Sequence, residues 1–181
     1  LKPVGITLPS SSFTLPADQT ELTLSTAAEL KQISLWSKSS TLSGYKFIMT
    51  DDIDLENASD YEPIGYHGAN GETFQGIFDG NGYEIKNLYV NTPSTSNSGL
   101  FGKCEDALIQ NLTVSGEVNG KDYVGGIVGS IFIYQDLPEN YGIQNCVSYV
   151  NVTGTEAAGG IVGHVYNSEI YSTGKYGSSS Y

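Results

Sequence analysis

Two stretches of this 181-residue chain are close copies of each other, and this repeat constrains the fold more than any other feature of the sequence. The stretch IQNLTVSGEVNGKDYVGGIVG (109–129) aligns without a gap to IQNCVSYVNVTGTEAAGGIVG (143–163), with ten of twenty-one positions identical. Self-similarity of this kind is typical of repeat proteins, in which each copy forms one unit that stacks on the next. The sequence therefore predicts a stack of similar turns.

Shorter copies of the pattern flank these two stretches. The isoleucines that begin the pattern fall at positions 85, 109, 143 and 170, in steps of 24, 34 and 27 residues. The longest step contains the segment SIFIYQDLPENYG (130–142), which we interpret as containing an insertion of about seven residues. We expect the insertion to form a surface loop on one side of the stack.

Within one copy the pattern is that of short β-strands. Leu112, Val114 and Val118 share one parity, and Gly120 then breaks the strand. A short unit of this kind cannot bury its apolar side alone, but it can do so against its neighbours. We therefore expect an all-β fold, a parallel β-solenoid (β-helix-like) of about three to four rungs with interior columns of Ile, Leu and Val side chains. By analogy with known β-solenoids we expect it to be right-handed.

The first part of the chain lacks the repeat. In STAAELKQISLWSK (25–38), Thr26 and Glu29 have the spacing of a capping box, and the apolar residues that follow lie on roughly one side of a helix. We expect a short helix near 26–38 that covers the open end of the solenoid.

These patterns also predict the domain organisation. Residues 1–21, rich in proline and serine, are expected to form an extended lead-in or linker, and residues 22–181 the β-solenoid domain, with repeats from 85 onward. The last copy begins at Ile170 and is followed by no polar capping element. We therefore expect the chain to be a fragment of a longer protein.

Asparagine recurs at one place in the pattern. Asn87, Asn111 and Asn145 each stand two positions after an isoleucine, and we hypothesise that they form a hydrogen-bonded ladder at a bend. The segment DGNG (79–82) is predicted to be a tight turn, because it lacks the lysine of a phosphate loop and the distal acids of a calcium loop.

Charge excludes several classes of partner. Eight lysines and no arginine stand against twenty acidic residues, giving a formal net charge of −12. Nucleic acid would be repelled, and the arginine fork that commonly holds phosphates and carboxylates is missing. No apolar run is long enough to insert into a membrane, and the first residues do not form a signal peptide, so an export signal would be absent from this chain.

The glycine motifs resemble a known family. GLFG (99–102) and the two copies of GGIVG (125–129 and 159–163), each associated with Ile-x-Asn, resemble the GLUG-motif repeats of bacterial surface and adhesin-like proteins. The resemblance covers about residues 22–173 and implies a cell-surface or secreted repeat protein without a catalytic role of its own. Similar segments occur in non-catalytic regions of immunoglobulin A1-specific metallopeptidases. The chain has only His67 and His164 and no His-Glu-x-x-His, so peptidase chemistry would lie elsewhere.

One acidic segment is a weak candidate for calcium. In TDDIDLEN (50–57), Asp52, Asp54 and Glu56 alternate along an expected strand, and oxygen-only clusters suit Ca²⁺. The segment lacks the glycine and the final glutamate of an EF-hand loop, which favours solvated carboxylates. We expect no metal site and no cofactor.

Aromatic residues are the candidates for ligand binding. Phe132, Tyr134 and Tyr141 lie in the segment with the insertion, where exposed rings would be unfavourable without a partner, and Tyr123 precedes it. We therefore expect an exported adhesin-like or structural module that binds a host protein or a glycan. The alternatives are a polysaccharide-acting enzyme on a β-helix scaffold, which would need paired carboxylates across a groove, and an accessory domain of a surface peptidase.

Overall fold

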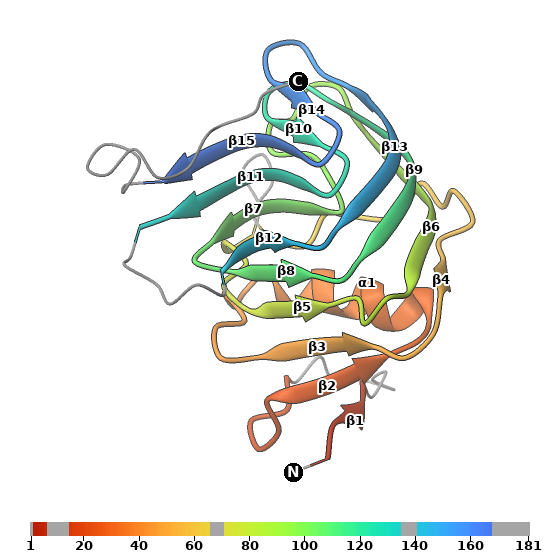
Figure 1. Ribbon diagram of the computed structural model, residues 1–181, viewed down its shortest axis with the longest axis vertical. Coiled ribbons are helices and arrows are strands. Elements are labelled where there is room, and N and C mark those ends of the chain that lie inside the picture. The colour runs from red at the N-terminus through yellow and green to blue at the C-terminus, as the bar shows by residue number, and fades with distance from the viewer. Residues whose placement is uncertain (1, 7–14, 66–70, 135–140, 168–181) are drawn as a thin grey trace.

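Neighbouring strands pair in parallel throughout the described chain. The computed structural model describes residues 2–6, 15–65, 71–134 and 141–167. Parallel strands need a long connection between them, and here each connection is the remainder of one turn of the coil. The chain is a parallel β-solenoid of about four turns, as the sequence predicts (Figure 1).

Three sheets form the walls of the solenoid. The first sheet contains β1 (Val4–Gly5), β2 (Glu21–Leu24), β3 (Lys46–Met49), β5 (Ile77–Asp79), β8 (Leu108–Gln110) and β12 (Gly142–Gln144). The second sheet contains β4 (Ile53–Asp54), β6 (Glu84–Thr92), β9 (Thr113–Gly120) and β13 (Val147–Thr153). The third sheet contains β7 (Phe101–Glu105), β11 (Val128–Ile133) and β15 (Val162–Asn167), and the short pair is β10 (Val124–Gly125) with β14 (Ala158–Gly159).

The direction of winding is visible in Figure 1. The chain rises from the N-terminus, runs to the right along the first sheet, and returns to the left along the third sheet.

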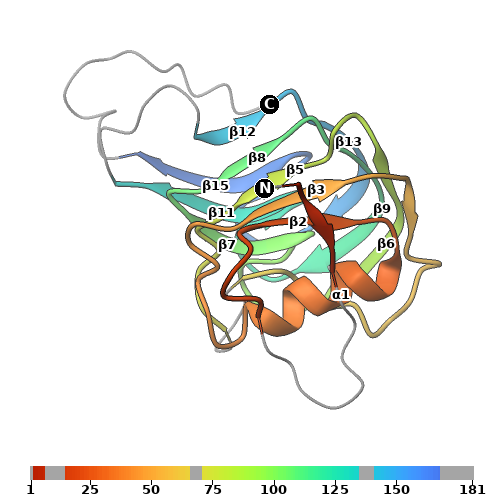
Figure 2. The same ribbon diagram turned by 90° about the horizontal axis from the view of Figure 1, so that it is seen from below.

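One helix, α1 (Ala27–Trp36), follows β2 in the first turn. Thr26 caps its N-terminus: the Thr26 Oγ1 atom accepts a hydrogen bond from Glu29 N, and Thr26 N donates to the Glu29 carboxylate. Figure 2 shows α1 on the side of the molecule opposite β8 and β12. Leu30, Ile33 and Trp36 are buried and belong to the core. The helix therefore covers the core of the first turns on the side that has no strand there.

Interior columns of apolar side chains run along the solenoid, as predicted. Ile53, Ile85 and Val114 pair in register in the second sheet and are almost fully buried. The early turns add packed aromatic rings to these columns, with centroids 5.2 to 6.3 Å apart. These rings belong to Phe47, Phe74, Phe78 and Phe101.

The gapless alignment of the two long copies is confirmed residue by residue. Ile109 pairs with Ile143, Val118 with Val152, and Val128 with Val162. Each of these pairs is separated by the same 34 positions as in the sequence alignment.

The alignment of Ile85 with Ile109 is wrong. Ile109 pairs with Phe78 of β5, whereas Ile85 lies in the second sheet opposite Val114. The step of 24 residues therefore does not describe a turn, and the equivalent step from Phe78 to Ile109 is 31 residues. Ile-x-Asn recurs at 85–87 because a bulge interrupts β6 between Ile85 and Leu88, and asparagine tolerates the positive φ of 55° there.

The asparagine ladder is consequently shorter than predicted, and it ends at Asp79 instead of Asn87. Asn145 Nδ2 donates to Asn111 Oδ1 at 2.8 Å, and Asn111 Nδ2 donates to Asp79 Oδ1 at 3.0 Å. Asn87 lies in another column, where its Nδ2 donates to Asp54. The DGNG segment is a tight turn, as expected, and forms the same corner in its turn of the solenoid as Asn111 forms in the next.

Candidate functional site

Five aromatic rings lie side by side on the outer side of the third sheet, and we call them the ring surface. Their neighbouring centroids are 4.8 to 5.9 Å apart, which is the range of favourable aromatic contacts. Three of the rings remain partly exposed: Tyr134 at 47%, and Tyr123 and Tyr166 at 37% each. The five residues are Tyr123, Phe132, Tyr134, His164 and Tyr166.

The strand register brings these rings together. Phe132 of β11 pairs with Tyr166 of β15, so the two rings pack against each other across neighbouring turns, tilted by 30°. His164 pairs with Ser130 and points to the same outer side, where its ring contacts Phe132 and Tyr123. Side chains two positions apart on a strand share a side, so one pair of strands can carry a row of rings.

Tyr123 reaches this row from an unusual backbone conformation. Its φ is 57°, in the left-handed region, where a side chain such as tyrosine is disfavoured by about 1 to 2 kcal/mol. The preceding turn has Asn97 at this corner, with φ 61°, and Asn97 Oδ1 accepts a hydrogen bond from Ser130 Oγ. In the later turn this polar contact is replaced by a tilted contact between the rings of Tyr123 and His164, whose centroids are 4.8 Å apart.

The corner also explains the last glycine of the repeated GGIVG motif. A Cβ atom on Gly129 would lie 2.5 Å from the carbonyl carbon of Asn97. A Cβ atom on Gly163 would lie 2.6 Å from the carbonyl carbon of Tyr123. The backbone of each corner thus passes directly over the glycine of the next turn, and a larger residue at Gly163 would displace the backbone of Tyr123.

Charged groups border the ring surface on the side of β7. The Lys103 Nζ atom lies 4.2 Å from the centroid of Phe132, which is a cation–π contact. Glu105 pairs in register with Phe132. Burial raises the pKa of the Tyr134 hydroxyl, and the nearby carboxylates of Glu105 and Asp106 raise it further. The surface therefore combines aromatic faces with groups that can form hydrogen bonds.

A hollow of about 440 Å³ lies beside the first residues of β3 and β5, and one of its lining residues, Asp106, contacts Tyr134 of the ring surface. Asp106 connects the two, because it lines the hollow and its Oδ1 atom accepts a hydrogen bond from Tyr134 N at 2.9 Å. The hollow presents an ammonium group, a carboxylate and two tyrosines. Its lining includes Tyr45, Lys46, Gln75, Asp106 and Tyr141.

The structure brings most of the predicted aromatic residues together. Phe132, Tyr134 and Tyr123 belong to the ring surface, and Tyr141, 36% exposed, lies apart from them in the hollow. The predicted insertion implied that Phe132 lies in a loop, but Phe132 lies in strand β11. Residues 135–140 of the insertion, and the copy that begins at Ile170, lie outside the described residues.

Sequence reasoning missed His164 and Tyr166. A signal for both was present, because the alignment of VGSIFI with VGHVYN places Ser130 opposite His164 and Phe132 opposite Tyr166. Both pairs lie just beyond Gly129 and Gly163, where the identical residues of the two copies end.

The calcium candidates do not gather into a site. β4 is only two residues long, and Glu56 follows it in a turn with φ 55°, so the three acids do not alternate along one strand. Asp52 accepts hydrogen bonds from Lys86 Nζ and Glu84 N, and these hold its pKa below the usual value. Asp54 accepts from Asn87 Nδ2 and Glu56 N, and its pKa is likewise lowered.

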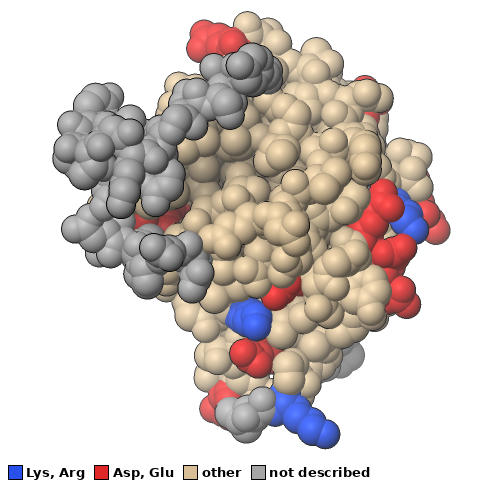
Figure 3. All heavy atoms as spheres, in the orientation of Figure 1, with Lys and Arg blue, Asp and Glu red and all other residues tan. Residues whose placement is uncertain are grey.

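No group of three or more metal-binding side chains occurs within the described ranges. In Figure 3 the acidic and basic side chains gather along the right-hand edge, where Figure 1 shows β4 and β6, and toward the lower end. These acids are best described as ion-paired or solvated surface groups.

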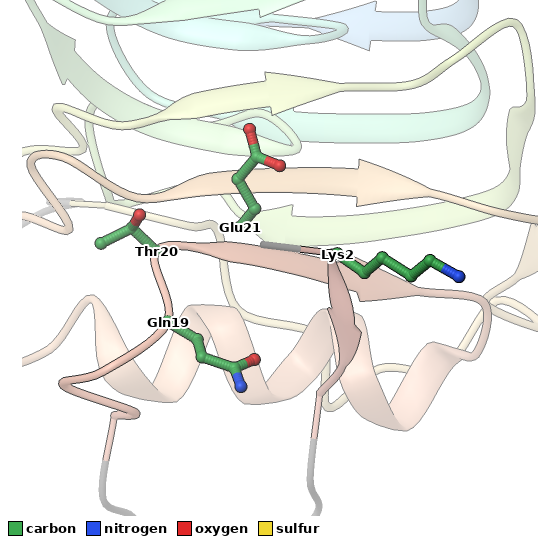
Figure 4. A pocket seen from close by; sticks show the side chains of 4 residues that line it. All are labelled: Lys2, Gln19, Thr20 and Glu21. Atoms are coloured by element: carbon green, nitrogen blue, oxygen red, sulfur yellow. The ribbon is translucent and has the colours of Figure 1, made fainter.

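A second hollow, of about 240 Å³, lies near the N-terminus and is lined by Lys2, Gln19, Thr20 and Glu21. Figure 4 shows that these four side chains point away from one another. These side chains do not converge on a common point where they could bind one ligand.

Comparisons with known proteins give two distant relatives. The chain is 33% identical over 111 residues to a protein of Evansella cellulosilytica named as a Gly-rich membrane protein, a match that covers 58% of this chain and 12% of the relative. It is 30% identical over 110 residues to halomucin of Haloquadratum walsbyi, a match that covers 45% of this chain and 1% of halomucin. No family model matches the sequence, and no solved structure matches it. The chain thus spans a small part of the length of relatives that are much longer.

Proposed function

We propose that this chain is a repeat module of a long exported protein, and that it holds a glycan or a protein through the ring surface without catalysing a reaction. The observation that carries the proposal is the row of five rings, part of which is exposed on a rigid sheet. Preorganised aromatic side chains bind partners at a small entropic cost, since the strands already fix them.

The setting of the module supports this role. The two relatives match over 12% and 1% of their own lengths, as a module of a larger protein would. One of them is named as a membrane protein, which supports a bacterial cell-surface or secreted location for the whole protein. None of the helices in the described ranges has the length and hydropathy needed to cross a membrane.

The glycine motifs support membership in the GLUG-repeat group of adhesin-like proteins. In the structure GLFG and both GGIVG copies occupy matching places, with Phe101, Val128 and Val162 in one register. In the two GGIVG copies the final glycines, Gly129 and Gly163, lie where the preceding corner of the backbone crosses, which is a structural reason for glycine there. An accessory domain of a surface peptidase would have the same architecture.

The competing hypothesis is an enzyme that acts on polysaccharide. Such an enzyme would place two carboxyl groups on either side of a bound chain. Glu105 and Asp106 are adjacent residues at one border of the ring surface, and Gln75 Nε2 and Tyr134 N respectively donate to them. Their hydrogen bonds suit residues that shape a surface, and we propose a binding role for both.

A binding screen tests the proposal. The labelled chain would be applied to immobilised polysaccharides, glycoproteins and extracellular proteins, and compared with Tyr134→Ala/Tyr166→Ala and with the control Tyr149→Ala. Tyr149 is 72% exposed on β13, in the second sheet, so its removal should leave binding unchanged.

We expect retention by at least one of these materials, loss of retention in the double variant, and no release of reducing ends from any polysaccharide. Release of reducing ends would favour the enzyme. Equal retention of the double variant would place the binding surface elsewhere.

A further inference from the structure

We propose that the ring surface and the hollow beside β3 and β5 together form one site for an uncharged oligosaccharide, with sugar rings stacked on the tyrosines and a neighbouring sugar in the hollow. This inference rests on the proposed function and names the class of ligand. It is carried by three observations: the size of the exposed rings, the charge around them, and the connection between rings and hollow.

The exposed rings are small compared with a protein interface. Tyr123, Tyr134 and Tyr166 are 37%, 47% and 37% exposed. At about 200 Å² for each tyrosine, they offer roughly 250 Å² of surface. A specific protein partner usually covers about 800 Å² on each side. A short oligosaccharide fits the smaller area, because the flat face of a sugar matches the face of one ring.

The charge around the rings selects against acidic sugars. The chain carries a formal net charge of −12 and no arginine, so it lacks the fork that binds carboxylates in pairs. Glu105 and Asp106 stand at the border of the rings, and the Lys103 ammonium already lies over Phe132. An anionic sugar would approach two carboxylates in an acidic molecule, whereas the hydroxyl groups of a neutral sugar could donate hydrogen bonds to them.

The hollow extends the surface in one direction. Asp106 lines the hollow and its carboxylate accepts a hydrogen bond from the backbone N–H of Tyr134, so this one residue lies at the border of both regions. The hollow has a volume of about 440 Å³ and is lined by Lys46, Gln75 and Tyr141 among others. These side chains supply donors, acceptors and one ring, which is the usual composition of a site for a polar ligand.

The backbone at Tyr123 supports a functional role for the rings. Asparagine suits the left-handed conformation of this corner, and the preceding turn has Asn97 there. Tyrosine at the same corner in the next turn opposes the local backbone preference. Such conflicts tend to occur at functional sites, where another advantage offsets the strain.

The test is calorimetric titration of the chain with neutral hexasaccharides of glucose, mannose, galactose and xylose, and with hexagalacturonate as the acidic counterpart. We expect at least one neutral hexasaccharide to bind and hexagalacturonate not to bind. Tyr134→Ala and Tyr166→Ala should each weaken binding about 10-fold, the loss of one stacking contact. Tyr141→Ala should lower the affinity for the hexasaccharide. It should leave the affinity for the disaccharide of the same sugar unchanged, since the shorter sugar contacts only the rings.

Two further variants make the test specific. Tyr134→Leu keeps an apolar side chain without a flat ring, so its affinity for the sugar should fall as much as that of Tyr134→Ala. Tyr149→Ala is the matched control on another sheet and should bind as the unmodified chain does. The melting temperature of each variant confirms that it is folded.

The outcomes separate the two proposals. If no neutral sugar binds while a protein free of glycans is retained through the rings, the glycan inference is overturned and the binding module stands. Binding of hexagalacturonate as tight as that of every neutral sugar would also overturn the inference. If the rings hold neither sugars nor proteins, both proposals fail.

Discussion

The turn built by residues 109–129 and the turn built by residues 143–163 have closely related sequences and different surroundings. In the earlier turn Ile109, Val114 and Val118 are completely buried. In the later turn Ile143 and Val152, which pair with Ile109 and Val118, are only half-buried, and Ile161 is 37% exposed. Burial in a solenoid is therefore set by the turns on either side, and the same motif has different energetic weight at different places in the stack.

The comparison predicts that equivalent core substitutions have unequal effects. Ile109→Ala should lower the free energy of unfolding by about 3 kcal/mol, because it leaves a cavity between packed turns. Ile143→Ala should lower it by only about 1 kcal/mol, since part of this side chain is already in contact with water. Urea denaturation of the two variants measures the difference. Equal losses would show that the later turn is as well covered as the earlier one.

Glycine gives a second matched pair. Gly126 and Gly160 are equivalent in the two copies of GGIVG. A Cβ atom at Gly126 would overlap the carbonyl oxygen of Gly160 and the hydroxyl of Ser148, whereas one at Gly160 would meet no atom of the described residues within 4 Å. Gly126→Ala should therefore destabilise the chain by about 2 kcal/mol, and Gly160→Ala by less than about 0.5 kcal/mol. Thermal unfolding of both variants checks this, and a harmless Gly126→Ala would contradict the close packing of the turns.

The asparagine ladder gives a third pair, with smaller effects. Asn111 makes two hydrogen bonds of the ladder, because it donates to Asp79 and accepts from Asn145. Asn145 is exposed and makes one, the bond that it donates to Asn111. Both residues have positive φ, so alanine adds similar backbone strain at each. We expect Asn111→Ala to cost about 2 kcal/mol and Asn145→Ala about 1 kcal/mol. Chemical denaturation of the two variants measures this difference, and equal losses would mean that the side-chain ladder adds nothing.

The sequence allowed the fold to be predicted because the two long copies repeat without a gap. Every pair along them, such as Ile109 with Ile143, has the offset that the alignment gives. The earlier turns could not be aligned in the same way. There the column of Ile109 continues as Phe78, and a bulge at Asn87 produces a false copy of the motif. A local motif can recur for a local backbone reason, so motif spacing alone does not define the turns.

The candidate site was only partly predictable for a similar reason. The apolar segment around Phe132 and Tyr134 was visible in the sequence as a surface feature. Which rings would stand beside it depended on the register between β11 and β15, and that register brings in His164 and Tyr166. Tyr123 reaches the row through a backbone conformation that residue preferences argue against.

The smallest expected effect concerns the carboxylate at the base of the ladder. Burial tends to raise the pKa of Asp79, but hydrogen bonds donated by Asn111 and Gln110 outweigh it, so the pKa is lowered. A carboxyl group with a lowered pKa stabilises the folded chain above its unfolded pKa of about 3.9, and this contribution is lost as the pH falls through the folded value. Asp79→Asn should therefore be less stable than the unmodified chain at pH 6, by less than about 1 kcal/mol, and the two should converge as the pH falls below about 3.9. Urea denaturation across this range measures the gap, and a gap independent of pH would mean that Asp79 supports the corner through its shape rather than its charge.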